Sequence, residues 1–329
     1  MASLRALYDL PAPAKLNLFL HVVGRRADGY HLLQSVFALL DWADVLHLER
    51  REDGCLLRHD LAPGPVSGGE PDRLRALPAD DLCLRAARAL QRASGTTLGV
   101  DIGLEKRVPW GAGLGGGSSD AATTLLGLNR LWGLRWPRER LLELALGLGA
   151  DLPFFIGGEN AFVEGIGERL TPVALPRAWY AVVKPSASLS TAAIFRSPLL
   201  QRSEEAAIVA GSFVSAYASK GQGLPWGPKG AEAPEPVAGD WLQQVVEGFG
   251  RNDLQVAAED GCNEVRQAAA WLQQRHGNSR MTGSGSAVFA RAGTGDQPLA
   301  AFAADELPPG WEGRMCRSLA RHPLADWAG

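Results

Sequence analysis

Residues 109–120 read PWGAGLGGGSSD, and this stretch decides the fold. Five of the seven residues from 111 to 117 are glycine, which leaves the backbone N–H groups free to turn towards an anion. Residues 98–107 before it predict a strand, and residues 119–131 after it predict a helix that ends at Gly133. The positive end of that helix dipole faces the same place, so the pattern predicts a polyphosphate site.

The glycine-rich stretch is also compatible with an ordinary turn, in which Ser118 or Ser119 caps the helix. A Walker loop requires a lysine after the glycines, and none follows here. Residues 111–116 match the dinucleotide pattern GxGxxG, but that fold needs an acidic residue ending a second strand about 20 residues on. Residues 134–139 read instead as a loop, which argues against a dinucleotide-binding dehydrogenase.

Composition narrows the class of protein. The chain has 329 residues, 46% of them apolar, which is enough for a full core and excludes general disorder. A net charge of −3 argues against a nucleic-acid partner, and the lack of an 18-residue apolar run argues against a membrane. The four cysteines show no metal-binding spacing, so no metal site is predicted. With no secretion leader visible, we expect a cytoplasmic metabolic protein.

The periodicity of the remaining chain predicts an α+β protein. Residues 14–23 alternate in the manner of a half-buried strand, with Lys15 and Asn17 on its polar face. Further strands are predicted at 31–40, 44–49, 161–163, 180–183 and 286–290, and helices at 81–94, 137–148, 241–249 and 264–275. Gly149 is the predicted C-cap of the helix at 137–148. We expect two domains, 1–165 and 166–329, with a flexible surface insertion at 211–239.

Two polar residues stand in apolar surroundings and suit phosphoryl transfer. Asp151 follows a helix stop in GLGADLPFF at 147–155, and Lys15 lies on the first strand. Such a transfer needs a group that orients or deprotonates the acceptor hydroxyl and a cation for the developing charge. Each residue could also have a purely structural role: Lys15 as a solvated strand lysine, and Asp151 as the N-cap of a short helix starting at Leu152.

Two further segments are ambiguous by themselves. Residues 281–289, MTGSGSAVF, form a second glycine-rich turn before a strand, which fits a tight hairpin as well as a ligand contact. Tyr30 and His31 follow the turn at Asp28-Gly29, and their rings could stack on a base or simply begin a strand.

Taken together, these segments resemble the GHMP kinases, the family of galactose, homoserine, mevalonate and phosphomevalonate kinases. The resemblance is carried by six stretches in family order: PAKLNLFL at 13–20, RADGYH at 26–31, GLGGGSSDAA at 113–122, GADLPFF at 149–155, EGIGE at 164–168 and TGSG at 282–285. It implies a two-domain GHMP kinase fold with ATP and substrate in the cleft between the domains.

The resemblance also implies roles for individual residues. Asp151 is expected to be the base for the acceptor hydroxyl, with Lys15 paired to it, and Asn17 to place the substrate. The cytosine of the acceptor is expected to lie against Tyr30, His31 and Phe195. The expected nucleotide-binding residues are Lys106, Pro109, Gly111, Gly113, Leu114, Gly115, Gly116, Gly117, Ser118 and Ser119.

Within the family, the match is closest to the branch that phosphorylates the 2-hydroxyl of a cytidine-diphosphate-linked methylerythritol, in the non-mevalonate isoprenoid pathway. ATP is the expected donor, and Mg²⁺ is expected to arrive with it. A GHMP kinase for mevalonate or a sugar, and a catalytically inactive nucleotide-binding regulator, are the alternatives. Monomer and homodimer are both left open.

Overall fold

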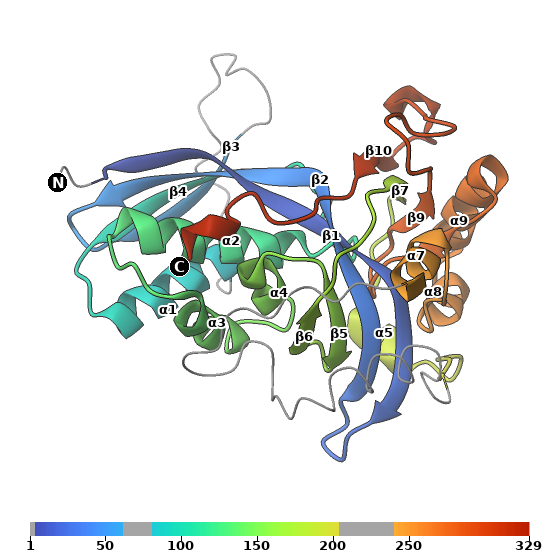
Figure 1. Cartoon of the computed structure of the whole chain (residues 1–329), viewed down its shortest axis with the longest axis horizontal. Helices are drawn as coiled ribbons and strands as arrows, with labels where there is room; N and C mark the ends of the chain where they lie inside the picture. The colour runs from blue at the N-terminus through green and yellow to red at the C-terminus, as the bar shows by residue number, and fades with distance from the viewer. Residues whose placement is uncertain (1–3, 62–80, 204–239, 329) are drawn as a thin grey trace.

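The computed structural model describes residues 4–61, 81–203 and 240–328 (Figure 1). The predicted insertion at 211–239 lies outside these residues. The described chain forms two sheets with helices packed on them, which confirms the α+β class. None of the helices in these ranges combines the length and the apolar character that a membrane span requires.

The larger sheet is built around a long antiparallel pair, β1 and β2. Its strand order is β3-β4-β2-β5-β6, with β1 paired to β2 off this path. All pairings are antiparallel except β3 with β4. The six strands are β1 (Ala6–Arg25), β2 (His31–Arg51), β3 (Leu56–Leu61), β4 (Gly99–Glu105), β5 (Ala161–Gly165) and β6 (Arg169–Pro172).

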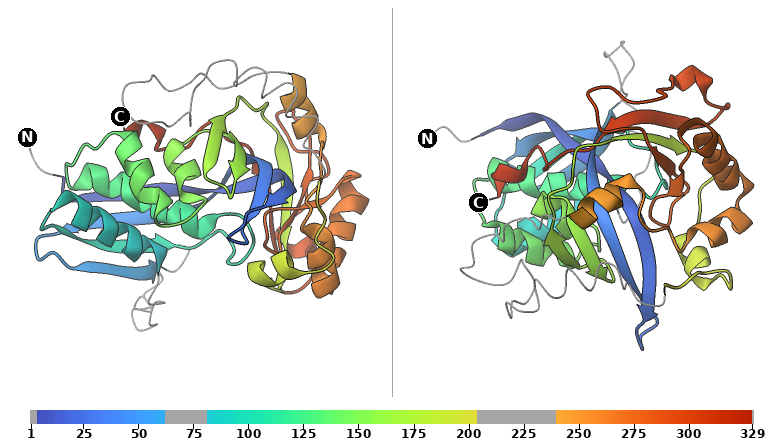
Figure 2. Two further views of the ribbon diagram at one scale, coloured as in Figure 1. Left: turned by 90° about the horizontal axis from the view of Figure 1, so that it is seen from below. Right: turned by 45° about the vertical axis from the view of Figure 1, so that its right-hand side comes forward.

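Four helices lie together against this sheet and close the first core (Figures 1 and 2). They are α1 (Leu82–Ser94), α2 (Gly116–Leu131), α3 (Arg138–Leu146) and α4 (Leu152–Gly157). The helix α2 is buried along nearly its whole length, because it lies between the sheet and the other helices. Its small residues, such as Ala121 and Gly127, allow that close approach: a Cβ added at Gly127 would lie 2.4 Å from Leu48.

The smaller sheet has the strand order β10-β7-β9-β8 and occupies the other half of the molecule. Its strands are β7 (Trp179–Lys184), β8 (Arg280–Met281), β9 (Val288–Arg291) and β10 (Glu312–Arg317). The helices of this half are α5 (Thr191–Arg196), α7 (Asp240–Glu247), α8 (Gln255–Gly261) and α9 (Asn263–His276), with short 3₁₀ turns at Ala304–Glu306 and Ala325–Trp327.

The strand β1 runs through both halves and is buried on both faces, not half-buried as predicted. Leu10 belongs to the first core cluster, Leu16 to a second that joins the two sheets, and Leu20 to a third under the smaller sheet. The polar face of the strand is covered because the glycine loop and the segment around Thr282 pack over it. Lys15 is consequently a buried lysine, and the solvated alternative is wrong.

Several element boundaries differ from the predicted ones. Residues 31–51 form one continuous strand, not two. The helix α2 begins at Gly116 after Gly115 in the N-cap position, so neither Ser118 nor Ser119 is its cap. The helix α3 ends at Leu146, which makes Gly147, and not Gly149, its C-cap.

The end of the chain returns to the first half. Leu324 and Ala328 are buried in the first core cluster, although they follow the smaller sheet in sequence. The strand β6 also belongs to the larger sheet, although it follows residue 165. The domain boundary near residue 165 stays a prediction.

Candidate active site

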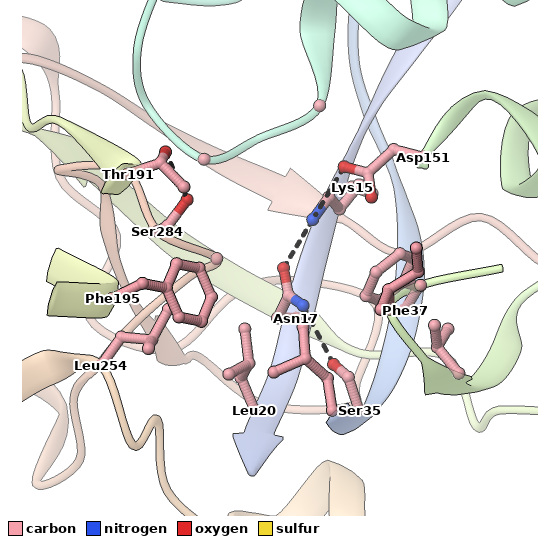
Figure 3. Close-up of a pocket in the computed structure, with 17 residues that line it drawn as sticks. Lys15, Asn17, Leu20, Ser35, Phe37, Asp151, Thr191, Phe195, Leu254 and Ser284 are labelled. Atoms are coloured by element: carbon pink, nitrogen blue, oxygen red, sulfur yellow. Dashed lines mark hydrogen bonds and ion pairs between the residues drawn. The ribbon is translucent and has the colours of Figure 1, made fainter. Parts of the chain in front are cut away.

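Lys15 is the centre of a buried polar group on β1 (Figure 3). Its side chain is only 4% exposed, and its Nζ lies 3.4 Å from Oδ2 of Asp151. The same Nζ donates a hydrogen bond of 2.6 Å to Oδ1 of Asn17 and lies 4.3 Å from the centre of the Phe37 ring. A buried ammonium group needs such partners, because the desolvation of an unpaired buried ion costs on the order of several kcal/mol.

Asn17 is fixed by its own hydrogen bonds. Its Nδ2 donates to Oγ of Ser35 at 3.0 Å, and that hydroxyl donates to the carbonyl of Phe19 at 2.5 Å. The backbone N–H of Asn17 donates to Oγ1 of Thr282 at 2.9 Å. The amide is therefore oriented with its oxygen towards Lys15.

Asp151 reaches Lys15 from the start of α4. It precedes α4 and occupies the N-cap position, but its side chain makes no capping hydrogen bond. The carboxylate is instead turned towards Lys15 and is 30% exposed, so it reaches the open space of the pocket. The prediction that Lys15 and Asp151 are brought together is consistent with this geometry; their catalytic roles stay predictions.

The glycine loop passes directly over this pair. Gly115, with φ of 72°, is the N-cap of α2, and a Cβ added there would lie 3.0 Å from both Lys15 Cγ and Phe155 Cζ. The backbone N–H of Lys15 donates to the carbonyl of Leu114 at 2.9 Å. Only glycine combines this left-handed conformation with such a close approach. The loop thereby sets the positive end of α2 beside Lys15.

The second glycine stretch supports the first. Ala287 N–H donates to the Ala112 carbonyl at 3.1 Å, and a Cβ at Gly113 would lie 2.4 Å from the Thr282 carbonyl oxygen. Residues 281–287 therefore form the outer wall of the glycine loop. Their glycines are needed for tertiary packing against the loop, which a simple hairpin would not require.

Lys106 lies on the other side of the start of α2. A Cβ added at Gly116 would lie 2.9 Å from its Nζ, just as Gly115 abuts Lys15. The Nζ donates to Oδ2 of Asp44 at 2.5 Å and to Oδ2 of Asp120 at 2.9 Å, and it lies 4.7 Å from the centre of the exposed Trp110 ring. Two lysines thus flank the helix end that is expected to hold the triphosphate.

The cluster around Lys106 carries one more negative than positive group when both carboxylates are ionised. Burial raises the pKa of Asp120; Lys106 opposes that rise, and the neighbouring Asp44 adds to it. Burial by itself lowers the pKa of Lys106, but the carboxylates of Asp120 and Asp44 outweigh it, so its pKa is raised. Lys106 therefore stays protonated while Asp120 prefers its neutral form.

Lys15, Asp151 and the glycine loop border one pocket of about 270 Å³ between the two halves of the molecule (Figure 3). Asp151 and Lys15 form one side of it, and α5 with the second glycine stretch forms the other. Thr191 of α5 and Ser284 face each other there, with their hydroxyl oxygens 2.8 Å apart. The lining residues are Lys15, Asn17, Leu20, Leu33, Ser35, Phe37, Gly113, Gly115, Asp151, Val163, Ile166, Gly167, Thr191, Phe195, Leu254, Gly283 and Ser284.

The three aromatic residues expected to contact the cytosine differ in their positions relative to the pocket. Phe195 lines the pocket, and its ring stacks on that of His31 with 5.0 Å between centroids and 24° between planes. Tyr30, at the turn before β2, is 62% exposed and is not among the described residues that line the pocket. The geometry therefore joins His31 to Phe195 and leaves Tyr30 at the surface.

Among the described residues, no group of three or more His, Cys, Asp or Glu side chains is placed to hold a metal ion. The nearest carboxylates to the glycine loop already pair with lysines: Asp151 with Lys15, and Asp44 and Asp120 with Lys106.

Four polar residues of the site were not predicted from the sequence. Ser35, Asp44, Asp120 and Thr282 each bond to a predicted site residue or to the segment that leads into the glycine loop. Asp120 directly follows the two serines of the loop, which was a usable signal. Asp44 lies between two predicted strands, and nothing local distinguishes it from a surface aspartate.

Comparison with known proteins identifies the class that this fold and site define. The family model of the GHMP kinases N terminal domain matches residues 81–159, which include the glycine loop and Asp151. A solved structure of homoserine kinase from Cytophaga hutchinsonii shares the fold, with a TM-score of 0.60 at 15% identity over 98% of this chain and 96% of that one.

More similar relatives give the particular family. A 4-diphosphocytidyl-2-C-methyl-D-erythritol kinase of Methylibium petroleiphilum is 60% identical over 99% of this chain and 100% of its own length. One of a Polaromonas species is 52% identical over 98% of this chain and 95% of its own. A solved 4-(cytidine 5'-diphospho)-2C-methyl-D-erythritol kinase superposes with a TM-score of 0.66 and 33% identity, over 94% of this chain and 98% of that one. The chain belongs to the family of 4-diphosphocytidyl-2-C-methyl-D-erythritol kinases, and it is a kinase.

Proposed function

We propose that the protein transfers the terminal phosphoryl group of ATP to the 2-hydroxyl of 4-diphosphocytidyl-2-C-methyl-D-erythritol and so forms its 2-phosphate. Family membership supports the reaction, since the relatives at 50–60% identity carry this name over their full length. The observation that carries the proposal is the Lys15–Asp151 pair, set at 3.4 Å in a pocket that the glycine loop borders.

Asp151 is proposed to accept or orient the proton of the acceptor hydroxyl. Its carboxylate is the exposed member of the pair, so the hydroxyl can reach it, while Lys15 behind it is buried. Because phosphoryl transfer passes through a loose transition state, positioning of the hydroxyl matters more than base strength. Lys15 would also stabilise negative charge on the transferred group.

The nucleotide is proposed to lie along the glycine loop, with its triphosphate over the start of α2. Backbone N–H groups at the start of α2 have no helical partner, so they can bond phosphate oxygens. The reacting end of the triphosphate would lie near Lys15, which packs against Gly115. The other end of the triphosphate would lie near Lys106, which packs against Gly116. ATP supplies the activated phosphoryl group; this chain supplies its alignment.

The acceptor is proposed to occupy the pocket between Asp151 and α5. Asn17, held by Ser35 and oriented towards Lys15, would fix the hydroxyl-bearing end. The cytosine would lie at the stacked pair His31 and Phe195, with Tyr30 closing over it from the exposed turn. Burial lowers the pKa of His31, so the neutral ring would offer a hydrogen-bonding nitrogen to the base edge.

Magnesium is proposed to enter as the ATP complex. Among the described residues, no cluster of carboxylates is placed to bind the ion, and the nearby carboxylates are paired with lysines. Magnesium carried by ATP would offset the negative charge of the phosphate groups during the transfer. We further propose that the enzyme works in the cytoplasm, in the non-mevalonate route to isoprenoid precursors.

The test is turnover with a panel of acceptors. Purified protein with magnesium-ATP should release ADP with 4-diphosphocytidyl-2-C-methyl-D-erythritol, and not with mevalonate, homoserine or galactose. Turnover with one of those acceptors instead would support kinase activity but refute the proposed identity of the acceptor. Tight ATP binding with no turnover on any of them would favour a nucleotide-binding regulator.

A further inference from the structure

Lys184 is a buried lysine whose ammonium group is held by the backbone. It is the last residue of β7, and its exposed fraction is only 6%. Its Nζ donates to three successive carbonyl oxygens, those of Pro185 at 2.7 Å, Ser186 at 3.4 Å and Ala187 at 3.2 Å. Three acceptors match the three N–H donors of an ammonium group. The charge is therefore solvated by peptide dipoles of the segment that directly follows it.

This arrangement differs from that of the two lysines beside the glycine loop. Lys15 and Lys106 each pair with a carboxylate. Among the described residues, no Asp or Glu oxygen lies within ion-pair distance of Lys184. Carbonyl dipoles that point to one place repel one another unless a cation or a donor lies between them. The ammonium group of Lys184 is therefore the centre around which residues 185–187 turn.

The segment that follows this turn reaches the glycine loop. A Cβ added at Gly111 would lie 3.2 Å from Oγ of Ser188, so this serine packs directly against the first glycine of the loop. Within the turn, the N–H of Ala187 donates to Oε2 of Glu264, in the first turn of α9, at 3.2 Å. The turn is thus fixed to α9, and the residue after it touches the loop that is proposed to hold the nucleotide.

The same segment leads into α5 and so supports one side of the pocket. Ser190 is the N-cap of α5, and its Oγ accepts a hydrogen bond of 3.4 Å from the N–H of Ala193. Thr191, the first residue of the helix, lines the pocket, and its hydroxyl oxygen lies 2.8 Å from that of Ser284 (Figure 3). Ser284 belongs to the second glycine stretch. The residues from 185 to 190 therefore connect both glycine stretches to the α5 side of the pocket.

We propose that Lys184 is a positioning residue of the kinase, whose ammonium group fixes residues 185–190 in the shape that holds the α5 side of the pocket against the glycine loop. This rests on the proposed function and deepens it, because it names a residue that acts on substrate binding through the backbone. Lys184 itself is not among the described residues that line the pocket. Its effect passes through Ser188, which packs on Gly111, and through Thr191 on α5.

Loss of the charge should loosen the binding of both substrates. Without an ammonium group, the carbonyls of residues 185–187 lose their shared donor and must turn towards water or other donors. The chain between them and α5 then shifts with them. The reacting pair, Lys15 and Asp151, lies on β1 and at the start of α4, outside this segment. Substrate binding should consequently be impaired more than the chemical step.

The experiment compares Lys184→Met with Gln91→Met in steady-state kinetics and in calorimetric binding of a non-hydrolysable ATP analogue. Methionine keeps an unbranched apolar side chain but has no donor. Gln91 is the matched control, because its Nε2 donates to two loop carbonyls, those of Gly54 and Leu98, at 2.9 Å each. None of these three residues is among the described ones that line the pocket.

The two variants should differ in substrate affinity. For Lys184→Met we expect the KM of ATP, the KM of the acceptor and the Kd of the ATP analogue each to rise about 10-fold, as for a lost charge-assisted contact. The kcat should change by less than about threefold, since the reacting pair is untouched. Gln91→Met should leave all four quantities within about twofold of the wild type.

Chemical rescue tests the cation itself. Lys184→Ala removes the side chain beyond Cβ, and the removed atoms are those of a propylammonium ion. Propylammonium chloride should therefore lower the KM of ATP in Lys184→Ala by about threefold or more, and sodium chloride at the same ionic strength should not. Thermal melts show whether each variant is folded. If Lys184→Met does not fold, Lys184→Gln, which keeps a donor without the charge, replaces it in the comparison.

Three results would overturn the proposal. They are a Kd of the ATP analogue within twofold of the wild type in Lys184→Met, an equal rise in Gln91→Met, and equal recovery of Lys184→Ala with propylammonium and with sodium. A fall in kcat with both KM values unchanged would also contradict it. Turnover of the wild type with the complete acceptor is measured separately. Its absence would refute the proposed function, whereas the Kd of the ATP analogue still decides the role of Lys184.

Discussion

The Nζ of Lys15 lies 3.4 Å from Oδ2 of Asp151, although one residue belongs to β1 and the other to the start of α4. The two side chains are unequally buried, with 4% of Lys15 and 30% of Asp151 exposed. The ammonium group thus supports the carboxylate from behind, and the carboxylate faces the pocket. An acceptor hydroxyl can approach Asp151 without displacing the lysine, which is the arrangement that proton acceptance and charge stabilisation both require.

Asn17 orients this lysine, so replacing it should impair catalysis. Asn17→Ala removes the 2.6 Å hydrogen bond to Lys15 and leaves the ammonium group with Asp151 as its one remaining polar partner among the described contacts. We expect kcat to fall at least 10-fold in steady-state assays, with the KM for ATP changed less than threefold. Ser35→Ala, which only loosens Asn17, should cost less. A wild-type kcat in Asn17→Ala would show that Lys15 needs no such anchor.

The glycine at the N-cap of α2 should tolerate no side chain. Gly115→Ala places a methyl group 3.0 Å from Lys15 Cγ and Phe155 Cζ, at a φ of 72°. Gly133→Ala is a matched control, with φ of 67° and nothing within 4 Å. Both should lose about 1 kcal/mol of stability from backbone strain. Only Gly115→Ala should lower kcat/KM for ATP, by 10-fold or more; similar kinetics for the two variants would contradict the assigned position of the loop.

The raised pKa of Asp120 should appear in the pH dependence of stability. The folded carboxyl holds its proton up to a pKa of about 8, whereas the unfolded one loses it near the ordinary value of about 4. Between these values the folded state binds more protons, so this group's contribution to stability falls as pH rises, by at most about 1.4 kcal/mol per pH unit. In urea melts, the free energy of unfolding of Asp120→Asn should therefore rise relative to that of the wild type between pH 5.5 and pH 8. A difference that stays constant over this range would mean that Asp120 is ionised throughout.

Arg138 connects the returning C-terminal segment to α4, the helix that begins after Asp151. Its guanidinium donates to the carbonyls of Ile156 and Gly157 at 2.8 and 2.6 Å, and to those of Ala325 and Ala328 in the returning C-terminal segment. Arg138→Ala leaves these buried carbonyls unpaired, and should lower the free energy of unfolding by about 2–4 kcal/mol.

Two variants give that prediction its controls. Arg138→Lys keeps the charge but cannot serve both segments, so it should recover only part of the loss. Arg321→Ala removes an exposed ion pair with Asp326 in the same C-terminal segment, and should cost less than about 1 kcal/mol. Chemical denaturation measures all three; equal losses for Arg138→Ala and Arg321→Ala would show that the buried bonds add nothing.

Local patterns were sufficient to predict much of this site. The glycine loop is readable because phosphate binding needs bare backbone before a helix, and Lys15 and Asp151 stand out because their neighbours are apolar. The start of α2 was placed three residues late, since serine is a common N-cap and the left-handed Gly115 leaves no side-chain signal. The α+β class followed from the periodicity of the strands and helices.

Tertiary contacts account for what the sequence could not reveal. The burial of Lys15 depends on segments 281–287 and 111–115 covering β1, which no period-two pattern records. Asp44 acquires its role because Lys106 and the backbone N–H groups of Arg107 and Val108 converge on it. The cluster that joins Leu324 to the first core likewise arises from the chain's return, and not from any feature near residue 324.

The most direct test is the rate of phosphoryl transfer in Asp151→Asn with saturating magnesium-ATP and 4-diphosphocytidyl-2-C-methyl-D-erythritol. The substitution keeps the size of the side chain but removes the charge that faces the pocket. We predict that kcat falls by about 10²–10⁴-fold, while the Kd of ATP stays within threefold of the wild-type value. A kcat within 10-fold of the wild type would contradict the account, because the Lys15–Asp151 pair would then not be the centre of the reaction.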